Sequence, residues 1–293
     1  MKKFLFIAVL IWSMVSFAAV SGDHIGTSIK PGSYPPVHPD VFFQAEQFYT
    51  GTFSESSTFE NIRGGVIPHH LVAHKLIARV FNHLKPQNPG TIILIGPNHN
   101  NEGDRIITSF QGWQTPFGVV NVDEKLLRDI CLASPLIKQD DQIMGKEHAM
   151  GNIMPFIKYY LPETKVVPLI FHHNLTIDEA SSLGKQLAAL IDDNTVILAS
   201  VDFSHYLMPD EAEEKDKETI YALKTWNLGR IFTMGDEYLD SPPSLGVLFR
   251  AMDKLGMRDF TVLNHTNSGV LLGNKNIETT SYITLLFGIE HKK

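Results

Sequence analysis

The sequence predicts an α/β fold of three layers, in which a central, mostly parallel or mixed sheet lies between two layers of helices. From residue 64 onward, short apolar segments typical of buried strands alternate with longer segments of helical periodicity. The clearest strand is Thr91–Ile95, which is rich in β-branched residues and is followed by Gly96 and Pro97. Histidines follow several of these strands. Together, these observations predict one sheet with polar side chains gathered along one edge.

Each predicted element rests on a local pattern. The segment 70–84 carries apolar residues at helical spacing, which gathers them on one face. Asp123 is expected to cap the helix that ends near Ala133, and Pro242 and Pro243 suit the first turn of a helix. The predicted strands are 64–68, 91–95, 107–110, 117–122, 165–171, 195–200, 260–264 and 280–287, and the remaining predicted helices are 147–161, 176–192, 209–230 and 242–255.

Residues 1–19 have the features of a secretory signal peptide. Two lysines precede an apolar run that begins at Phe4, and the small residues Ser16 and Ala18 match a cleavage site. An uncleaved membrane anchor is the alternative, but the run is shorter than the ~20 residues that a spanning helix needs. We therefore expect an exported protein, periplasmic or extracellular, that is not held at a membrane after cleavage.

The rest of the chain divides into two parts by composition. Residues 20–62 are rich in Gly, Ser, Thr, Pro and aromatic residues, which predicts an irregular N-terminal arm. Residues 63–293 then form one α/β domain. The formal net charge of −7 and the lack of a basic patch argue against nucleic acid as a partner. Cys131, the only cysteine, excludes an internal disulfide and metal sites built from several cysteines, and its apolar neighbours indicate a buried structural thiol.

Histidines and an aspartate follow five of the predicted strands, although the chain has only 13 histidines in 293 residues. Ligands of open α/β sheets bind beyond the carboxyl ends of the strands, so this distribution predicts a single polar site there. The alternative is that exposed loops simply tolerate polar residues. The residues concerned are His69, His70, His99, His172, His173, Asp202, His205 and His265.

His69 and His99 are the strongest candidates for metal ligands, because they follow different strands and neutral imidazole is the commonest metal ligand. Asp240 is a candidate third ligand; it precedes a helix, where it could equally act as an N-cap. Two histidines and one carboxylate form the facial triad of non-haem Fe(II) oxygenases, which leaves coordination positions open.

Three further residues are candidates for proton transfer. His205 could act as a general acid or base, with Asp202 fixing its tautomer, or the pair could merely order a loop. His148 could supply a second group, or simply begin a surface helix. His70 and His74 lie one helical turn apart, a spacing that suits a metal but is common on solvated helices. The sequence contains no P-loop, dinucleotide-binding, H-E-x-x-H or G-x-S-x-G motif.

A set of short motifs, in order from Arg63 to Gly288, resembles the Memo-like family, the B protein of the AmmeMemoRadiSam set. Any one motif alone would be weak, but the ordered set is specific. The motifs are I-P-H at Ile67–His69, L-I-G-P-N-H at Leu94–His99, T-P-F-G at Thr115–Gly118, E-H and P-F at Glu147–Phe156, V-D-F-S-H at Val201–His205 and T-S-Y at Thr280–Tyr282.

The resemblance implies a fold similar to that of the class III non-haem iron extradiol dioxygenases. It implies His69 and His99 as metal ligands, and His205, with Asp202 and His148, as acid–base groups. Memo-like proteins carry a cysteine as third ligand where this chain has Asp240, whereas the related dioxygenases use a carboxylate. This chain also has Gly151 where the family usually has a glutamate, and relatives are mostly cytoplasmic.

Three functions are compatible with these patterns. The first is an exported oxidoreductase of the extradiol-dioxygenase type, with iron(II) favoured and copper or zinc as alternatives, acting on a small molecule or a peptide. The second is a non-catalytic protein that binds a metal or a peptide on the same fold. The third is a zinc hydrolase that uses the same histidines.

Overall fold

The computed structural model describes residues 37–39, 43–51 and 53–292. The predicted signal peptide, residues 1–19, lies outside the described residues, as does the first part of the predicted arm. No helix within the described ranges is both long and apolar enough to cross a membrane.

Four parallel strands form the centre of the main sheet. They are β2 (Ser57–Ile67), β9 (Thr195–Ser200), β3 (Thr91–Pro97) and β8 (Lys165–Phe171), in this spatial order. Every residue of β3 and β9 is buried, as expected for parallel strands covered on both faces. Their carboxyl ends therefore lie along the same edge.

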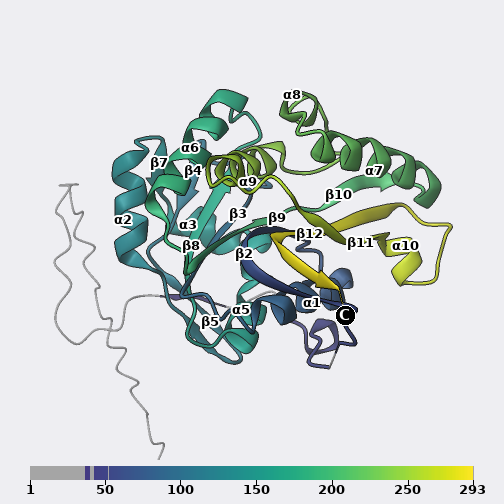
Figure 1. Ribbon diagram of the computed structural model, residues 1–293, viewed down its shortest axis with the longest axis horizontal. Coiled ribbons are helices and arrows are strands. Elements are labelled where there is room, and N and C mark those ends of the chain that lie inside the picture. Colours follow the sequence, from purple (N-terminus) through teal and green to yellow (C-terminus); the bar gives the residue numbers. More distant parts are fainter. Residues whose placement is uncertain (1–36, 40–42, 52, 293) are drawn as a thin grey trace, which may run out of the picture. The chain divides into compact units, whose positions relative to one another are not determined.

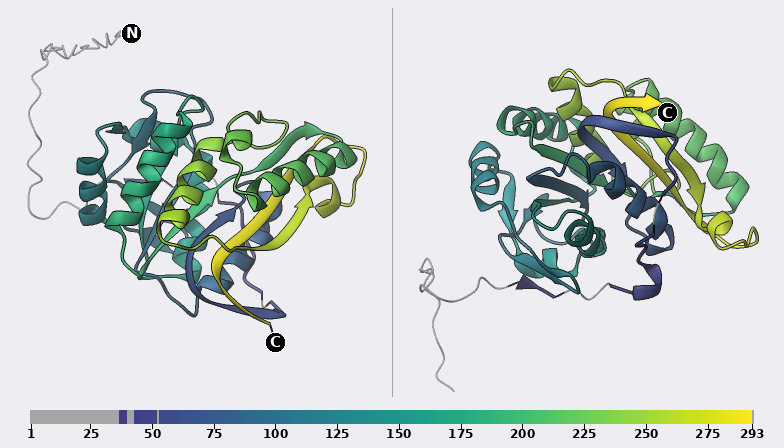
Figure 2. Two further views of the ribbon diagram at one scale, coloured as in Figure 1. Left: turned by 45° about the horizontal axis from the view of Figure 1, so that its top comes forward. Right: turned by 60° about the horizontal axis from the view of Figure 1, so that its bottom comes forward.

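The flanks make the sheet mixed rather than wholly parallel. β12 (Thr279–Lys292) runs antiparallel to β2, and both β10 (Phe203–Leu207) and β11 (Thr261–Asn267) pair with β12. At the other edge, β4 (Ile106–Thr108) is antiparallel to β8 and parallel to β7 (Ile137–Gln139). Figure 2 shows β12, in yellow, beside the dark blue β2.

Helices cover both faces of this sheet. Successive residues of a strand face opposite sides, so β3 contributes to two cores. Ile93 and Ile95 pack with α2 (Glu124–Ala133), α6 (Ile177–Leu190) and α9 (Pro242–Lys254). Ile92 and Leu94 pack with α1 (His74–Leu84) and α5 (Met154–Tyr160). Figure 1 shows α6 and α9 above the sheet and α1 and α5 below it. The predicted three-layer αβα architecture is confirmed.

Shorter elements complete the described chain. A small sheet contains β1 (Val37–His38), β5 (Gly112–Thr115) and β6 (Gly118–Val120). The remaining helices are α3 (Asp141–Lys146), α4 (His148–Gly151), α7 (Pro209–Lys224), α8 (Leu228–Ile231) and α10 (Ser268–Leu271), with 3₁₀ turns at Ala45–Gln47 and Leu71–Ala73.

The predicted strand 64–68 is too short at its N-terminal end. β2 begins at Ser57 rather than Gly64, so residues 57–62, predicted as irregular, belong to the main sheet. The early part of β2 pairs with the end of β12, and its residues alternate between buried and exposed. Only its last residues form the apolar run that a sequence pattern detects.

Two predicted helices are each divided in two. The segment 147–161 contains α4 and α5, and Pro155 occupies the first turn of α5, where its missing N–H costs no hydrogen bond. The segment 209–230 contains α7 and most of α8, separated at Trp226, whose φ of +55° ends helical geometry. Cys131, predicted as buried, is only half-buried, although it packs against the core.

Candidate metal centre

Three strands of the parallel centre bring predicted site residues to one edge of the sheet. His69 follows β2, His99 follows β3 and Asp202 follows β9. Asp240 reaches the same point from the loop before α9. Its backbone N–H donates to the Asp202 carbonyl oxygen at 3.2 Å, and the Asp202 N–H donates to Asp240 Oδ2 at 3.2 Å. This reciprocal pair holds the two carboxylates beside the histidines.

The tautomer of His69 follows from its hydrogen bonds. The Ser200 hydroxyl donates its single hydrogen to the Ala149 carbonyl oxygen at 2.8 Å. Ser200 Oγ must therefore accept from His69 Nδ1, which lies 3.2 Å away. This arrangement leaves a lone pair on His69 Nε2. Asn152 also donates to the His69 carbonyl oxygen at 2.8 Å, which fixes the backbone there.

His69 Nε2 faces two carboxylate oxygens. It lies 3.3 Å from Asp240 Oδ2 and 3.6 Å from Asp202 Oδ2. Because a lone pair and a carboxylate are both acceptors, a proton or a cation must lie between them. The second oxygen, Asp240 Oδ1, is buried and has no hydrogen-bond partner within the described chain. The donor set and this unpartnered oxygen therefore fit a metal ion, whose ligands at about 2.0–2.2 Å would lie at similar mutual distances.

The electrostatics of these residues also fit a bound metal ion. Burial raises the pKa of Asp240 well above its usual value, and the neighbouring Asp202 carboxylate raises it further. Burial also raises the pKa of Asp202 to about 7, despite hydrogen bonds from the His69 and His70 N–H groups that lower it. Burial lowers the pKa of His69 well below its usual value. A bound cation would offset the unfavourable burial of two adjacent carboxylates.

His99 is oriented by Glu147. Its Nδ1 lies 2.7 Å from Glu147 Oε1, and its backbone N–H donates to Glu147 Oε2 at 2.9 Å. Burial acts to raise the pKa of Glu147, but the His99 hydrogen bonds and that from the Ala149 N–H outweigh it and leave the pKa lowered. Glu147 thus remains ionised and accepts the Nδ1 proton. His99 Nε2, 3.9 Å from Asp240 Oδ2, is left free, as in carboxylate–histidine–metal arrangements.

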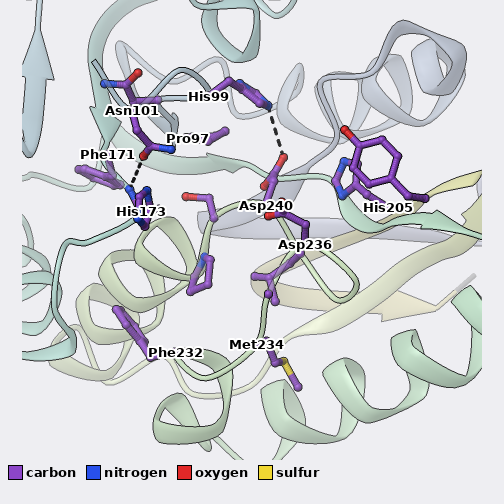
Figure 3. A pocket seen from close by; sticks show the side chains of 16 residues that line it. Pro97, His99, Asn101, Phe171, His173, His205, Phe232, Met234, Asp236 and Asp240 are labelled. Atoms are coloured by element: carbon purple, nitrogen blue, oxygen red, sulfur yellow. Dashed lines mark hydrogen bonds and ion pairs between the residues drawn. The ribbon is translucent and has the colours of Figure 1, made fainter. Parts of the chain in front are cut away.

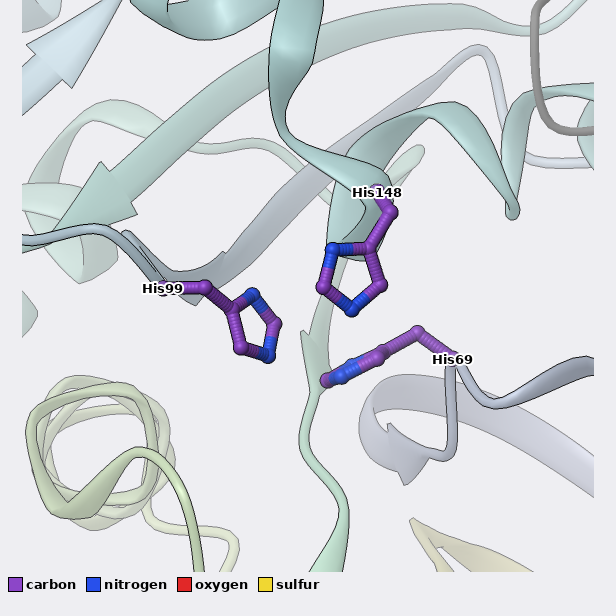
Figure 4. A group of neighbouring side chains, drawn as sticks. All are labelled: His69, His99 and His148. Carbon is purple, nitrogen blue, oxygen red and sulfur yellow. The ribbon is translucent and has the colours of Figure 1, made fainter.

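His148 joins the same group of histidines. Its ring stacks on that of His99 with centroids 4.0 Å apart, and its centroid lies 5.3 Å from that of His69 (Figure 4). One ligand atom from each of the three lies within 4.8 Å of the others, and the same holds for His69, Asp202 and Asp240. Burial, with the neighbouring His99, lowers the pKa of His148 to about 4, although Glu147 opposes this. His148 is therefore placed to bind a metal as well as to move a proton.

His205 lies near these residues without belonging to either metal-binding group. Its Nδ1 is buried and has no hydrogen-bond partner within the described chain, and burial lowers its pKa. Figure 3 shows His205 and His99 on either side of Asp240. This position suits a group that meets a bound molecule rather than the metal itself.

A cavity of about 640 Å³ opens beside this group. Its polar lining includes His99, His205 and Asp240, and its apolar lining includes Phe171 and Phe232. Figure 3 shows His173 and Asn101 on the side of the cavity away from His205. The cavity thus places a molecule of substrate size in contact with one side of the candidate metal centre.

The remaining candidate histidines serve other contacts. His70 is not helical; its Nδ1 lies 2.7 Å from the Tyr282 hydroxyl, and His74 Nδ1 donates to the Leu71 carbonyl oxygen at 3.0 Å. The metal pair considered for His70 and His74 is therefore not formed. His265 Nε2 lies 2.8 Å from Asp216 Oδ2. His173 lines the cavity, whereas His172 does not.

Three supporting residues were not among the site residues predicted from the sequence. Glu147 orients His99, Ser200 orients His69, and Asn152 holds the His69 backbone. A signal for Glu147 was its place beside His148 in the E-H motif. Ser200 and Asn152 carry no local signal, because their partners lie far away in sequence.

Comparison with known proteins agrees with this picture. The family model described as Memo-like protein matches residues 33–285. A MEMO1 family protein of Pyrobaculum arsenaticum is 31% identical over 238 residues, covering 78% of this chain and 84% of the relative. One of Aquifex aeolicus is 26% identical over 232 residues, covering 76% and 84%.

A solved structure shows the same fold at lower identity. The uncharacterized protein JW3007 from Escherichia coli K12 is similar with a TM-score of 0.55 and 13% identity, over 76% of this chain and 99% of that one. This likeness supports the αβα fold alone. The match of the family model, together with the relative from Pyrobaculum arsenaticum, confirms the resemblance of the ordered motifs: the chain belongs to the Memo-like family.

Proposed function

We propose that this protein is an exported, mononuclear metal-dependent oxidoreductase of the extradiol-dioxygenase type. The observation that carries the proposal is the convergence of His69, His99 and Asp240 beside a cavity of about 640 Å³. Two histidines and a carboxylate are the ligand set of non-haem iron oxygenases. Bound iron(II) would supply Lewis acidity and open coordination positions for a chelating substrate and dioxygen.

The chain's own residues would orient the ligands and move a proton. Glu147 and Ser200 hold His99 and His69 so that each Nε2 faces the centre. His205 lines the cavity and lies outside the metal-binding groups, and its buried Nδ1 has no hydrogen-bond partner among the described residues. It is therefore suited to take a proton from a bound hydroxyl group. The backbone of Asp202 is hydrogen-bonded to Asp240, and no hydrogen bond joins Asp202 to His205 among the described residues, so we propose that Asp202 supports the third ligand.

A non-catalytic metal-binding protein is the second candidate. It is favoured by the additional donors His148 and Asp202, which lie close enough to His69 to complete a coordination shell. A filled shell leaves no position for substrate. Three histidines would also suit copper or zinc, and the same set supports the zinc-hydrolase hypothesis.

Metal analysis and oxygen uptake separate these functions. Protein purified without oxygen is expected to retain about one iron per chain and to consume oxygen with catechols. Tight copper binding, with no uptake by the iron-loaded protein across a catechol panel, would favour the binding protein. Zinc-dependent hydrolysis without oxygen uptake would favour the hydrolase.

Two variants test the division of roles. His99→Ala should lose both metal and turnover, because it removes a ligand. His205→Ala should keep the metal and lose turnover by roughly 10²–10⁴-fold, the usual contribution of general acid–base catalysis. His291→Ala, at an exposed position of β12, is the control and should change neither. Equal metal loss in the first two variants would mean that His205 is a ligand.

A further inference from the structure

An irregular strand brings two consecutive side chains to the same cavity. Successive residues of a regular strand face opposite sides. In β10, however, the register with β12 shifts on both sides of His205, and Tyr206 has a φ of +59°. As a result, both His205 and Tyr206 line the cavity. The bulged strand therefore adds a tyrosine to a surface that would otherwise receive only the histidine.

No interaction within the described chain accounts for the unusual backbone conformation of Tyr206. A bulky residue in the left-handed region is strained. Yet Tyr206 is 73% exposed, its hydroxyl makes no hydrogen bond with a described residue, and its ring lies beside that of His205, with centroids 5.8 Å apart. Unsupported strain of this kind is commonly found where a protein holds a ligand. The exposed ring is therefore available to a molecule in the cavity.

Away from the candidate metal centre, the lining of the cavity carries one carboxylate, that of Asp236. The lining contains Asp236 and Asp240 but neither lysine nor arginine. Asp240 belongs to the candidate metal centre, whereas the Asp236 side chain is exposed and makes no ion pair with any described residue. The Asp236 carbonyl oxygen accepts from the His205 N–H at 2.9 Å, so its backbone adjoins the strand that carries Tyr206.

We propose that the cavity selects ligands in which a planar aromatic group carries an ammonium. The aromatic group would lie against Tyr206 and the ammonium would approach Asp236. This inference rests on the proposed function for the part of the ligand that binds the metal. A tyrosine face and a carboxylate both attract ammonium groups. A carboxylate or phosphate substituent would meet Asp236 with no basic residue of the lining to offset the repulsion.

The test compares three catechols that carry a neutral, a cationic or an anionic substituent at the same ring position: ethyl, aminoethyl and carboxyethyl. Their dissociation constants are measured with the iron(II)-loaded full chain under anaerobic conditions. The aminoethyl compound should bind about fivefold more tightly than the ethyl compound, and the carboxyethyl compound about fivefold more weakly, as expected for one partly screened charge pair.

Matched variants assign the effect to residues. Asp236→Asn should bring the three affinities together, whereas Glu237→Gln, which removes the adjacent exposed carboxylate outside the lining, should keep their order. Tyr206→Leu should weaken all three compounds, and Tyr206→Phe should not, because it keeps the ring. Tyr221→Leu, at a tyrosine that is 71% exposed outside the lining, should have no effect.

A second arm of the test uses the metal-free chain, so its result does not depend on metal binding. Binding of phenylethylammonium and phenylpropionate to the metal-free chain is compared by ligand-observed nuclear magnetic resonance, with Asp236→Asn as the control. If catechols fail to bind but phenylethylammonium is preferred through Asp236, the proposed function is wrong and the charge selection stands. Equal affinities, or preference for the carboxylate, in either arm would overturn the charge selection.

Discussion

Glu147 shows how one side chain can determine the chemistry of another. It accepts from both the ring Nδ1 and the backbone N–H of His99, and its Oε1 also accepts from the Ala149 N–H. These contacts fix the rotation of the imidazole and the nitrogen that carries the proton. The affinity of His99 for a metal should therefore depend on a residue that does not itself belong to the candidate metal-binding groups.

Glu147→Gln tests this dependence. The amide keeps the shape of the side chain but removes the charge, so the Nδ1 proton is held less firmly and Nε2 becomes less basic. We expect metal affinity to fall by about 10–100-fold, the usual effect of losing such a partner. Competition with a chelator of known affinity measures it. Glu163→Gln, at an exposed position, is the control, and an equal change in both variants would contradict the role of Glu147.

At the scale of elements, the contact between α6 and α9 supports the loop that carries Asp240. α9 begins at Pro242, two residues after Asp240, with Ser241 as its cap. A Cβ on Gly184 of α6 would lie 2.5 Å from the Val247 carbonyl oxygen and 3.1 Å from the Ala251 nitrogen of α9. The two helices can approach this closely only because residue 184 has no side chain.

Gly184→Ala should therefore destabilise the protein although alanine favours helices. Overpacking costs about 1–3 kcal/mol, and the higher helix propensity of alanine recovers about 1 kcal/mol at most. We expect a net loss in the free energy of unfolding, measured by denaturant titration. Gly229→Ala, where the added Cβ meets only Asn227 Oδ1 at 3.6 Å, should be neutral or slightly stabilising. Equal effects at the two glycines would contradict the close helix contact.

At the scale of the whole molecule, strand order assembles the candidate centre. β2, β9 and β3 are neighbours in space, so residues far apart in sequence follow adjacent strand ends. The parallel direction of these strands brings His69, His99 and Asp202 to one edge. The loop before α9 then adds Asp240, and the bulged β10 adds His205.

Export is a prediction for the whole chain. If Ser16-Phe17-Ala18 precedes the cleavage site, mass spectrometry of the native protein should find an N-terminus near Ala19. The protein should then appear in the periplasmic or extracellular fraction. Replacing Ala18 with a bulky residue should impair cleavage and serves as the matched variant. An intact Met1 in the membrane fraction would contradict the prediction.

The sequence by itself predicted the fold class, the family and the edge of the sheet where the site lies. Buried strands and amphipathic helices leave periodic local patterns in a sequence. His69, His99 and Asp202 could be predicted as site residues because each follows a predicted strand directly. Element boundaries were less well predicted. The early part of β2 lacks a long apolar run, and the break between α7 and α8 depends on the left-handed conformation of Trp226.

Only the tertiary structure decided which residues share the centre and what supports them. The contacts of Asp240 with His69, of Glu147 with His99 and of Ser200 with His69 join residues separated by long stretches of chain. The placement of His148 over His99 and of Tyr206 at the cavity depends on a helix start and a bulged strand. Local sequence patterns report periodic burial, whereas these contacts depend on how distant elements pack against one another.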